Sequence, residues 1–359
     1  MDDLKTIKVL LVEDTAVQRE LITYILEKDS QISIMGSATD GLEAIKILDD
    51  KKPDIILMDI NMPNLNGYEA SKIILKKYAI PIILMSATWR LEDVKKTVKS
   101  MELGIVMAIN KPPGVADPLF EVAADNLINT VKLVSEIKVV RRNKRDKKEK
   151  GSLISKNIFG NGYLNEYKVV VIGSSAGGPP ALQKIICGLP PSFPFPVLVV
   201  QHMSIGFSET FADWLNSISN LNVSIANNQE KAKGGCVYIA PDNNDMLIDN
   251  CGNIKLIPKD KKEFNQPTVT ALFDSALKSY QKDTIAIILS GMGKDGVDKM
   301  KELKDAGALT IVQDKESSIV FGMPGAAIKN GASVHELNPE KIVELLITIA
   351  DSTKGVTDG

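Results

Sequence analysis

The sequence predicts an α/β protein of two domains, each built on a mainly parallel, doubly wound sheet. The length of 359 residues is about two domains' worth, and a hydrophobic content of 44% is enough for two cores. Short apolar segments alternate with segments of helical hydrophobic spacing in both halves of the chain, on either side of a strongly basic stretch. Such alternation is typical of parallel strands covered by helices on both faces.

Composition excludes several other classes of protein. A net charge of −2 argues against wholesale nucleic-acid binding, and no segment approaches the roughly 18 consecutive apolar residues of a membrane span. The acidic residues 1–5 contain no apolar signal core, so we expect a cytoplasmic protein. The three cysteines, Cys187, Cys236 and Cys251, are too few and too scattered for a disulfide framework or a zinc site, and we expect them to be reduced.

The first part of the chain contains five strand-then-helix units. The apolar segments that we interpret as strands are residues 8–12, 32–37, 54–58, 80–84 and 105–109. Helical spacing between them is kept by Val17, Leu21, Ile22, Ile25 and Leu26, and then by Ala44, Ile45, Ile47 and Leu48. A closing helix is expected near residues 117–137. These elements predict a parallel, doubly wound sheet.

Carboxylates gather where these strands end. Glu13 and Asp14 follow the first strand, and Asp59 ends the third. Three converging carboxylates repel one another, so the arrangement makes best sense around a hard cation, for which Mg²⁺ is the natural choice. Ser86 ends the fourth strand and Lys111 follows the fifth, which equips Asp59 to accept a phosphoryl group and stabilise its charge. Acidic residues at strand ends often cap helices instead, but five matching positions in sequence order favour the phosphoryl-acceptor site.

Four motifs of this segment occur together in a known family. They are Leu11-Val12-Glu13-Asp14, Leu57-Met58-Asp59-Ile60-Asn61-Met62-Pro63 followed by Gly67, Met85-Ser86-Ala87, and Lys111-Pro112. Over essentially its whole length the segment resembles the receiver domain of two-component response regulators. The resemblance implies a flavodoxin-like (βα)5 fold, a sensor histidine kinase that phosphorylates Asp59, and Mg²⁺ held by Glu13, Asp14 and Asp59. It also implies that Ser86 and Lys111 contact the phosphate.

One position departs from the receiver pattern. Receivers usually carry an aromatic switch residue three positions before the lysine, whereas this chain has Ala108 before Lys111. We therefore expect the step from phosphorylation to surface change to be weaker, or to run through Ser86 and the helix after the fourth strand.

A basic stretch divides the chain. Its sequence is Lys138-Val139-Val140-Arg141-Arg142-Asn143-Lys144-Arg145-Asp146-Lys147-Lys148-Glu149-Lys150-Gly151. An RNA or an anionic membrane surface would attract this charge, but few apolar residues interleave with it and Gly/Ser/Asn-rich sequence follows, so we interpret it as a solvated, flexible linker. The predicted division is a first domain over 1–137, a linker over 138–165 and a second domain over 166–359.

The second domain opens with a candidate nucleophile. An apolar strand runs directly into G-x-S-x-G in Val169-Val170-Val171-Ile172-Gly173-Ser174-Ser175-Ala176-Gly177-Gly178. Glycines on both sides allow a sharp turn that lifts Ser175 off the end of a sheet, and a following helix would aim backbone N–H groups at a developing oxyanion. A phosphate-binding or merely packed turn is the alternative, since short glycine patterns match by chance.

A base and an orienting acid are found at two other strand ends. Only His202 and His335 supply imidazole; His202 closes the apolar segment 196–203, whereas His335 is expected in a loop. Asp295 follows a third apolar segment, 285–289, in a glycine-rich turn. Asp295 would otherwise cap the helix that begins near Gly296. Because serine, histidine and aspartate recur at matching places, we favour a catalytic triad of Ser175, His202 and Asp295.

The order Ser, His, Asp differs from that of the α/β-hydrolases, so the G-x-S-x-G motif is not evidence for that fold. Segments 235–241, 246–249 and 253–257 are short strands that we expect to form a small, hairpin-like antiparallel insertion. A late parallel strand is expected over 308–313 and a closing amphipathic helix over 342–350.

These and further segments match a second family. The matching motifs are residues 172–178, Gln201-His202-Met203, residues 237–241, Leu289-Ser290-Gly291-Met292-Gly293-Lys294-Asp295-Gly296, and Val320-Phe321-Gly322-Met323-Pro324. In that order, behind a receiver and a linker, they resemble the chemotaxis protein-glutamate methylesterase (CheB) family. The resemblance implies the same triad, with the backbone of Ala176 and Met292 in the oxyanion hole.

The function implied is a phosphorylation-regulated esterase with no cofactor of its own. It would hydrolyse γ-glutamyl methyl esters on the cytoplasmic helices of chemoreceptors, release methanol and also deamidate receptor glutamines. The receiver would cover Ser175 until Asp59 is phosphorylated.

Three departures from the family pattern leave two alternatives open. Ala176 replaces a threonine, Ser204-Ile205 replaces prolines, and residues 265–270 replace the usual Arg-Pro-Ser-Val-Asp run. The alternatives are a phospho-switched binding protein that has lost catalysis and a serine hydrolase for another ester or peptide.

Overall fold

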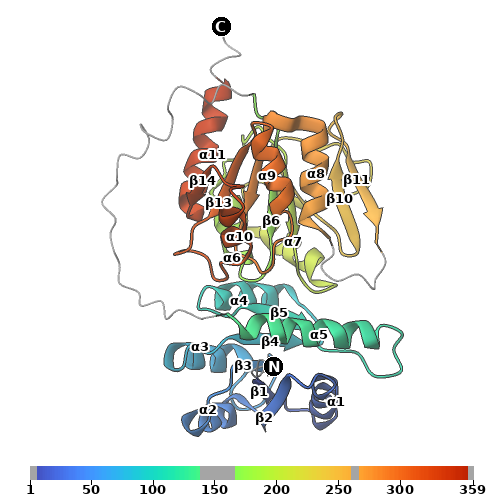
Figure 1. Ribbon diagram of the computed structural model, residues 1–359, viewed down its shortest axis with the longest axis vertical. Helices are drawn as coiled ribbons and strands as arrows, with labels where there is room; N and C mark the ends of the chain where they lie inside the picture. The colour runs from blue at the N-terminus through green and yellow to red at the C-terminus, as the bar shows by residue number, and fades with distance from the viewer. Residues whose placement is uncertain (1–5, 138–165, 260–266, 355–359) are drawn as a thin grey trace.

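The computed structural model describes residues 6–137, 166–259, 267–354. The predicted linker over 138–165 lies outside these residues, as do residues 260–266. Two α/β domains are stacked, each with its own sheet (Figure 1). None of the helices in the described part of the chain combines the length and the apolar character needed to cross a membrane.

The first domain has the five-stranded, entirely parallel sheet that its sequence predicts, and the strand order is β2-β1-β3-β4-β5. Its strands are β1 (Ile7–Val12), β2 (Ile32–Ala38), β3 (Ile55–Asp59), β4 (Ile82–Ser86) and β5 (Met107–Asn110). Its helices are α1 (Ala16–Glu27), α2 (Gly41–Asp50), α3 (Gly67–Lys77), α4 (Leu91–Met101) and α5 (Phe120–Ser135). Strands β3 and β4 are buried along their whole length, because helices cover both faces of the sheet.

The second domain has a seven-stranded parallel sheet in the order β14-β13-β12-β6-β7-β9-β8 and a two-stranded antiparallel sheet, β10-β11. The strands are β6 (Val169–Ser174), β7 (Val197–Gln201), β8 (Asn222–Ile225), β9 (Cys236–Ile239), β10 (Asn244–Ile248), β11 (Ile254–Pro258), β12 (Thr284–Ile288), β13 (Leu309–Gln313) and β14 (His335–Leu337). The helices are α6 (Pro179–Gly188), α7 (Phe207–Ile218), α8 (Val269–Tyr280), α9 (Val297–Asp305), α10 (Met323–Lys329) and α11 (Pro339–Lys354).

Two sequence-based expectations were wrong. Segment 235–241 does not join the antiparallel insertion; its strand β9 lies between β7 and β8 in the main sheet. Val237, Tyr238 and Ile239 are all buried, so this strand needs cover on both faces, which a two-stranded hairpin cannot give. His335 begins strand β14 rather than lying in a loop, and β8 was not expected at all.

The two domains meet at the carboxyl ends of the second domain's strands. Helix α4 packs against α6 and α7, and Figure 1 shows it beneath them. Val94 and Val98 of α4 are fully buried in the same apolar cluster as Phe207 and Phe211 of α7. The first domain therefore lies over the edge of the sheet where open α/β folds bind their ligands.

Candidate functional site

Strand register brings Ser175 and His202 side by side. The last residues of β6 and β7, Ser174 and Gln201, are paired, and the backbone N–H of His202 donates to Ser174 O at 2.9 Å. Because the strands are parallel neighbours, the residues that follow them emerge at the same edge of the sheet. Strand β6 also lies where the order of strands reverses, with β7 on one side and β12 on the other, which is the topological switch point.

The turn after β6 has the tight geometry that its glycines predict. Gly177 has φ of +69°, and a Cβ atom on Gly178 would lie 1.8 Å from Ser174 Oγ. The Ser175 N–H donates to Ser290 O at 3.0 Å, which ties the turn to the loop after β12. Helix α6 begins at Pro179, as expected. The backbone can follow this path only without side chains at these two glycines.

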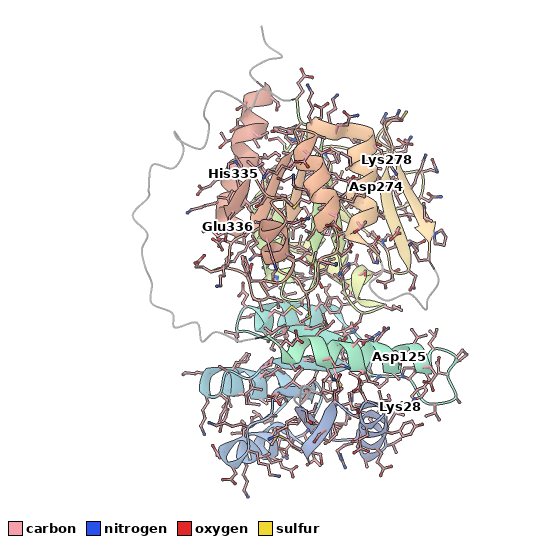
Figure 2. All side chains as sticks on the ribbon, viewed as in Figure 1. Lys28, Asp125, Asp274, Lys278, His335 and Glu336 are labelled. Carbon is pink, nitrogen blue, oxygen red and sulfur yellow. The ribbon has the colours of Figure 1, made fainter. Side chains whose placement is uncertain are left out.

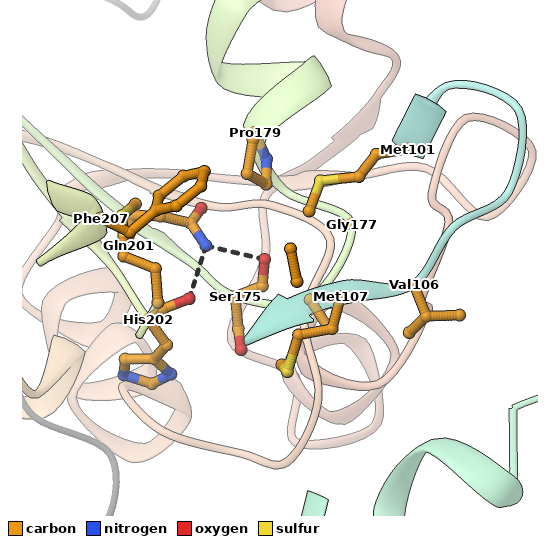
Figure 3. Close-up of a pocket in the computed structure, with 12 residues that line it drawn as sticks. Met101, Val106, Met107, Ser175, Gly177, Pro179, Gln201, His202 and Phe207 are labelled. Carbon is orange, nitrogen blue, oxygen red and sulfur yellow. Dashed lines mark hydrogen bonds between the residues drawn. The ribbon is translucent and has the colours of Figure 1, made fainter. Parts of the chain in front are cut away.

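Gln201 links the two residues, although sequence reasoning gave it no role. Its buried side-chain amide donates to the backbone oxygen of Ser175 at 2.9 Å and to that of His202 at 2.8 Å, as the dashed lines in Figure 3 show. One side chain thus sets the relative position of the two backbone segments. The signal in the sequence was a polar residue ending an otherwise apolar strand.

Asp295 completes the cluster. Its Oδ2 lies 3.0 Å from His202 Nε2, and the Asp295 side chain is only 18% exposed. Burial raises the pKa of this carboxyl, but the hydrogen bonds from His202, Thr270 and Val269 outweigh burial and hold the pKa below its usual range. Since Nε2 faces the carboxylate, Nδ1 is the ring nitrogen left to act as a base.

Asp295 does act as a helix cap, but for α8 and not for the helix that begins near Gly296. It accepts the N–H groups of Val269 and Thr270 at the start of α8 rather than those of α9. Thr270 belongs to the segment that departs from the family pattern, and its hydroxyl also donates to Asp295. The departure at Thr270 therefore changes a residue in direct contact with the proposed orienting acid.

The two candidate oxyanion donors lie on segments that are fixed by Ser290. The buried Ser290 hydroxyl donates to Ala176 O at 2.9 Å and accepts from Val320 N–H at 2.9 Å. Among the described residues, the backbone N–H groups of Ala176 and Met292 make no hydrogen bond, so both are available to a ligand oxygen. Gly291 allows this loop to approach the nucleophile, because a Cβ atom there would lie 3.0 Å from Ser175 Cβ.

Ser175 and His202 face a pocket that the first domain closes (Figure 3). The pocket is lined by both domains, and the first contributes Met101, Val106, Met107 and Ala108. Its volume is about 20 Å³, which is room for about one water molecule. Within the described chain, Ser175 Oγ makes no hydrogen bond to His202. The cluster is thus assembled but closed to a substrate.

Aromatic and polar contacts hold the domains in this arrangement. The rings of Trp89 and Phe207 meet edge to face with centroids 4.9 Å apart. Asn110 donates from Nδ2 to Ile205 O at 2.7 Å and from its backbone N–H to Ser204 Oγ at 3.3 Å. Ser204 and Ile205 are also departures from the family pattern, and they lie at this domain contact.

His335, the other histidine, is not part of the site. Figure 2 shows it on β14, away from the boundary between the domains. Its neighbours in the sheet are on β13, so β12 and β13 separate it from β6.

The predicted acid cluster assembles in the first domain. Ligand atoms of Glu13, Asp14 and Asp59 all lie within 4.8 Å of one another. Glu13 and Asp59 are buried, and Lys111 Nζ lies 2.8 Å from a carboxylate oxygen of each. Lys111 contacts two of the three carboxylates, so a negatively charged set of hard oxygen ligands remains, which fits a divalent cation.

The pKa values of Lys111 and Glu13 are both shifted by burial and by neighbouring charges in this cluster. Burial lowers the pKa of Lys111, but hydrogen bonds to Asp59 and Glu13 outweigh this and raise it. Burial raises the pKa of Glu13, and nearby Asp59 adds to this, although Lys111 opposes it. Ser86 is buried at the end of β4, where its hydroxyl donates to Thr88 O at 2.6 Å. All five predicted residues lie at the carboxyl edge of the sheet.

Comparisons with known proteins agree with this architecture. The family model described as response regulator receiver domain matches residues 9–119, and that described as CheB methylesterase matches residues 170–346. A protein from Nitrosospira multiformis named protein-glutamate methylesterase/protein-glutamine glutaminase is 41% identical over 96% of this chain and 97% of its own. One from Syntrophus aciditrophicus, with the same name and the number 1, is 39% identical over 96% of this chain and 99% of its own.

Among solved structures, the Thermotoga maritima CheB methylesterase catalytic domain is 42% identical, covers 51% of this chain and 98% of its own, and gives a TM-score of 0.47. The assignment to a family rests on the full-length relatives, because more than nine-tenths of both chains align at about 40% identity. The protein therefore belongs to the CheB methylesterase family, with a response regulator receiver domain ahead of the methylesterase domain.

Proposed function

We propose that this protein hydrolyses glutamyl methyl esters on chemoreceptors, with Ser175 as nucleophile, His202 as base and Asp295 as orienting acid. The observation that carries the proposal is the 3.0 Å contact between His202 Nε2 and Asp295 Oδ2, at the strand ends from which Ser175 also emerges. The names of the full-length relatives supply the substrate class.

The reaction proceeds in two halves. His202 Nδ1 takes the Ser175 hydroxyl proton as Oγ attacks the ester carbonyl carbon, and the backbone N–H groups of Ala176 and Met292 bind the resulting oxyanion. The proton then passes from Nδ1 to the departing methoxide, and methanol leaves. Water attacks the acyl-enzyme with the same nitrogen as base, which restores the serine and releases the glutamate carboxylate.

Deamidation of receptor glutamines uses the same steps. The acyl-enzyme formed from a glutamine side chain is identical to that formed from the methyl ester, and ammonia takes the place of methanol as the leaving group. His202 Nδ1 delivers the proton to that nitrogen. The relatives' double name supports this second reaction.

The receiver domain represses the esterase by covering its mouth. A volume of about 20 Å³ next to Ser175 cannot hold a glutamyl side chain, so the domains must separate before substrate binds. Phosphorylation of Asp59 by a sensor histidine kinase shifts the protein toward the separated arrangement. Glu13, Asp14 and Asp59 would hold Mg²⁺, which neutralises phosphate charge during transfer, while Ser86 and Lys111 contact the phosphoryl oxygens.

The route from Asp59 to the contact between the domains passes through the loop after β4. Ser86 is hydrogen-bonded to Thr88, and the neighbouring Trp89 packs on Phe207 of the methylesterase domain. Trp89 Nε1 also donates to Asn110 Oδ1 at 2.5 Å, and Asn110 binds Ile205 O. Movement of Ser86 toward a phosphoryl group therefore pulls on both inter-domain contacts. Trp89 thus supplies an aromatic side chain for the switch, in place of the aromatic residue that receivers usually carry at the position of Ala108.

Release of methanol from methylated receptor, with and without a small phosphoryl donor, tests the proposal. We expect slow release by the unmodified protein, faster release with the donor, and none from Ser175→Ala. Ser174→Ala is the matched control, because the Ser174 hydroxyl is buried without a hydrogen-bond partner in the described chain. A binding protein without catalysis would release no methanol, and a hydrolase for other esters would cleave a small ester but not the receptor.

A further inference from the structure

The carboxylate of Asp295 accepts hydrogen bonds from His202 and also from two residues outside the proposed triad, Val269 and Thr270. Oδ2 accepts from His202 Nε2 at 3.0 Å and from Val269 N–H at 2.7 Å. Oδ1 accepts from the N–H and from the hydroxyl of Thr270, at 3.0 and 2.5 Å. Each oxygen therefore has two donors, and one residue, Thr270, provides both donors to Oδ1.

The Thr270 hydroxyl is itself fixed on two sides. Its Oγ1 accepts the Gly296 N–H at 2.9 Å while it donates to Asp295 Oδ1. A hydroxyl has a single proton, so acceptance from Gly296 leaves that proton for the carboxylate. The threonine thus holds both the side chain of Asp295 and the backbone of the residue that follows it.

We propose that Thr270 is a positioning residue of the esterase, which holds Asp295 so that Oδ2 stays on His202 Nε2. The inference rests on the roles proposed above for His202 and Asp295. Rotation of the carboxyl group about Cβ–Cγ would carry Oδ2 away from the imidazole, and the proton would then be free to move from Nε2 to Nδ1. An imidazole protonated at Nδ1 cannot take the Ser175 proton.

The Thr270 hydroxyl holds the Asp295 carboxyl group in addition to the two backbone N–H groups at the start of α8. Thr268, not Thr270, caps α8 by accepting the Ala271 N–H, so the Thr270 side chain is not needed to begin the helix. The backbone N–H groups of Val269 and Thr270 persist in any variant that keeps α8. The hydroxyl is the part that a substitution removes.

Kinetics of the full-length protein, activated by a phosphoryl donor, test the proposal with methylated receptor as substrate. We expect Thr270→Val to lower kcat about tenfold with KM unchanged, because a hydrogen bond to a charged group is lost while the shape is kept. Thr270→Ser should restore kcat to within about twofold. Thr310→Val is the matched control, since this buried threonine in β13 has a hydroxyl without a partner among the described residues.

A spectroscopic readout is independent of turnover. The chain has only two histidines, so ¹⁵N-histidine labelling gives two imidazoles to assign. We expect His202 to be protonated at Nε2 in the unmodified protein and in Thr270→Ser, and to show a mixture of tautomers in Thr270→Val. If the valine variant does not fold, Thr270→Ala is measured instead.

Two results would overturn the inference: a valine variant with unchanged kcat and tautomer, or valine and serine variants impaired equally. The second would assign the effect to packing of the threonine methyl group. An unmodified protein that releases no methanol would instead contradict the proposed function, and the tautomer measurement would still decide the role of Thr270.

Discussion

His202 Nε2 lies 3.0 Å from Asp295 Oδ2, and this contact joins residues 93 positions apart in the chain. It favours the imidazole tautomer that carries its proton on Nε2, and so leaves Nδ1 for Ser175 in the proposed mechanism. The carboxylate can play this part because α8 directs two backbone N–H groups at it. Burial opposes ionisation of Asp295, but the imidazole, the Thr270 hydroxyl and the Val269 N–H together lower the pKa of its carboxyl group.

Asp295→Asn should lower kcat by roughly a thousandfold or more, because an amide that donates to Nε2 favours the wrong tautomer. Methanol release from methylated receptor measures this. Asp298→Asn is the matched control, since Asp298 is exposed and bonds to Asn330 rather than to the site. Equal loss in both variants would contradict the assigned role.

The contribution of Asp295 to the free energy of unfolding should decrease at low pH. Its pKa is below the ordinary value of 3.8 in the folded protein, so its ionised form stabilises the fold fully above about pH 4. That contribution is lost as pH falls through the lowered pKa. The difference in thermal midpoint between the unmodified protein and Asp295→Asn should therefore shrink below about pH 4. A difference that grows as the pH falls would contradict a lowered pKa for Asp295.

Gly178→Ala should damage the turn that carries the nucleophile. The added Cβ atom would lie 1.8 Å from Ser174 Oγ and 2.8 Å from Gln201 Oε1, both in the buried interior. We expect a loss of about 1–3 kcal/mol in stability, together with a fall in kcat. Thermal unfolding and methanol release check both effects. Gly114→Ala is the control, because nothing lies within 4 Å of its Cβ position, and it should behave as the unmodified protein.

Trp89→Ala should raise the basal esterase activity of the unphosphorylated protein several-fold. The substitution removes the ring contact with Phe207 across the domains, and it removes the bond that holds Asn110 in place to contact Ile205. Tyr24→Ala removes an exposed aromatic residue from α1, far from this contact, and should leave basal activity unchanged. A basal rate that stays low in Trp89→Ala would show that closure depends on other contacts.

Lys111→Met should tighten Mg²⁺ binding by about tenfold and abolish activation by a phosphoryl donor. The lysine ammonium lies 2.8 Å from carboxylate oxygens of Glu13 and Asp59, so its removal takes away a cation that competes with the metal. Titration calorimetry measures the affinity. Lys46→Met on the exposed face of α2 is the control. Weaker Mg²⁺ binding in Lys111→Met would mean that the lysine organises the carboxylates rather than opposing the ion.

Much of the candidate site was predictable because parallel sheets obey a local rule. Ser175, His202 and Asp295 were each identified as polar residues that follow an apolar strand, and the carboxyl ends of parallel strands share one edge. The same rule predicted Glu13, Asp59 and Lys111 in the first domain. The expectation that segment 235–241 joins the antiparallel insertion failed, because burial depends on partners distant in sequence. Its strand β9 is covered on both faces and lies between β7 and β8.

The sequence by itself determined the two parallel sheets, because period and spacing act over a few residues at a time, and its motifs indicated the family. It also predicted which residues lie at each sheet edge. Only the tertiary structure decided that Nε2 rather than Nδ1 of His202 meets Asp295, that Thr270 and Gln201 hold the site, and that Trp89 lies on Phe207. These contacts join segments tens of residues apart, and their geometry depends on how helices and domains pack, which no local pattern encodes.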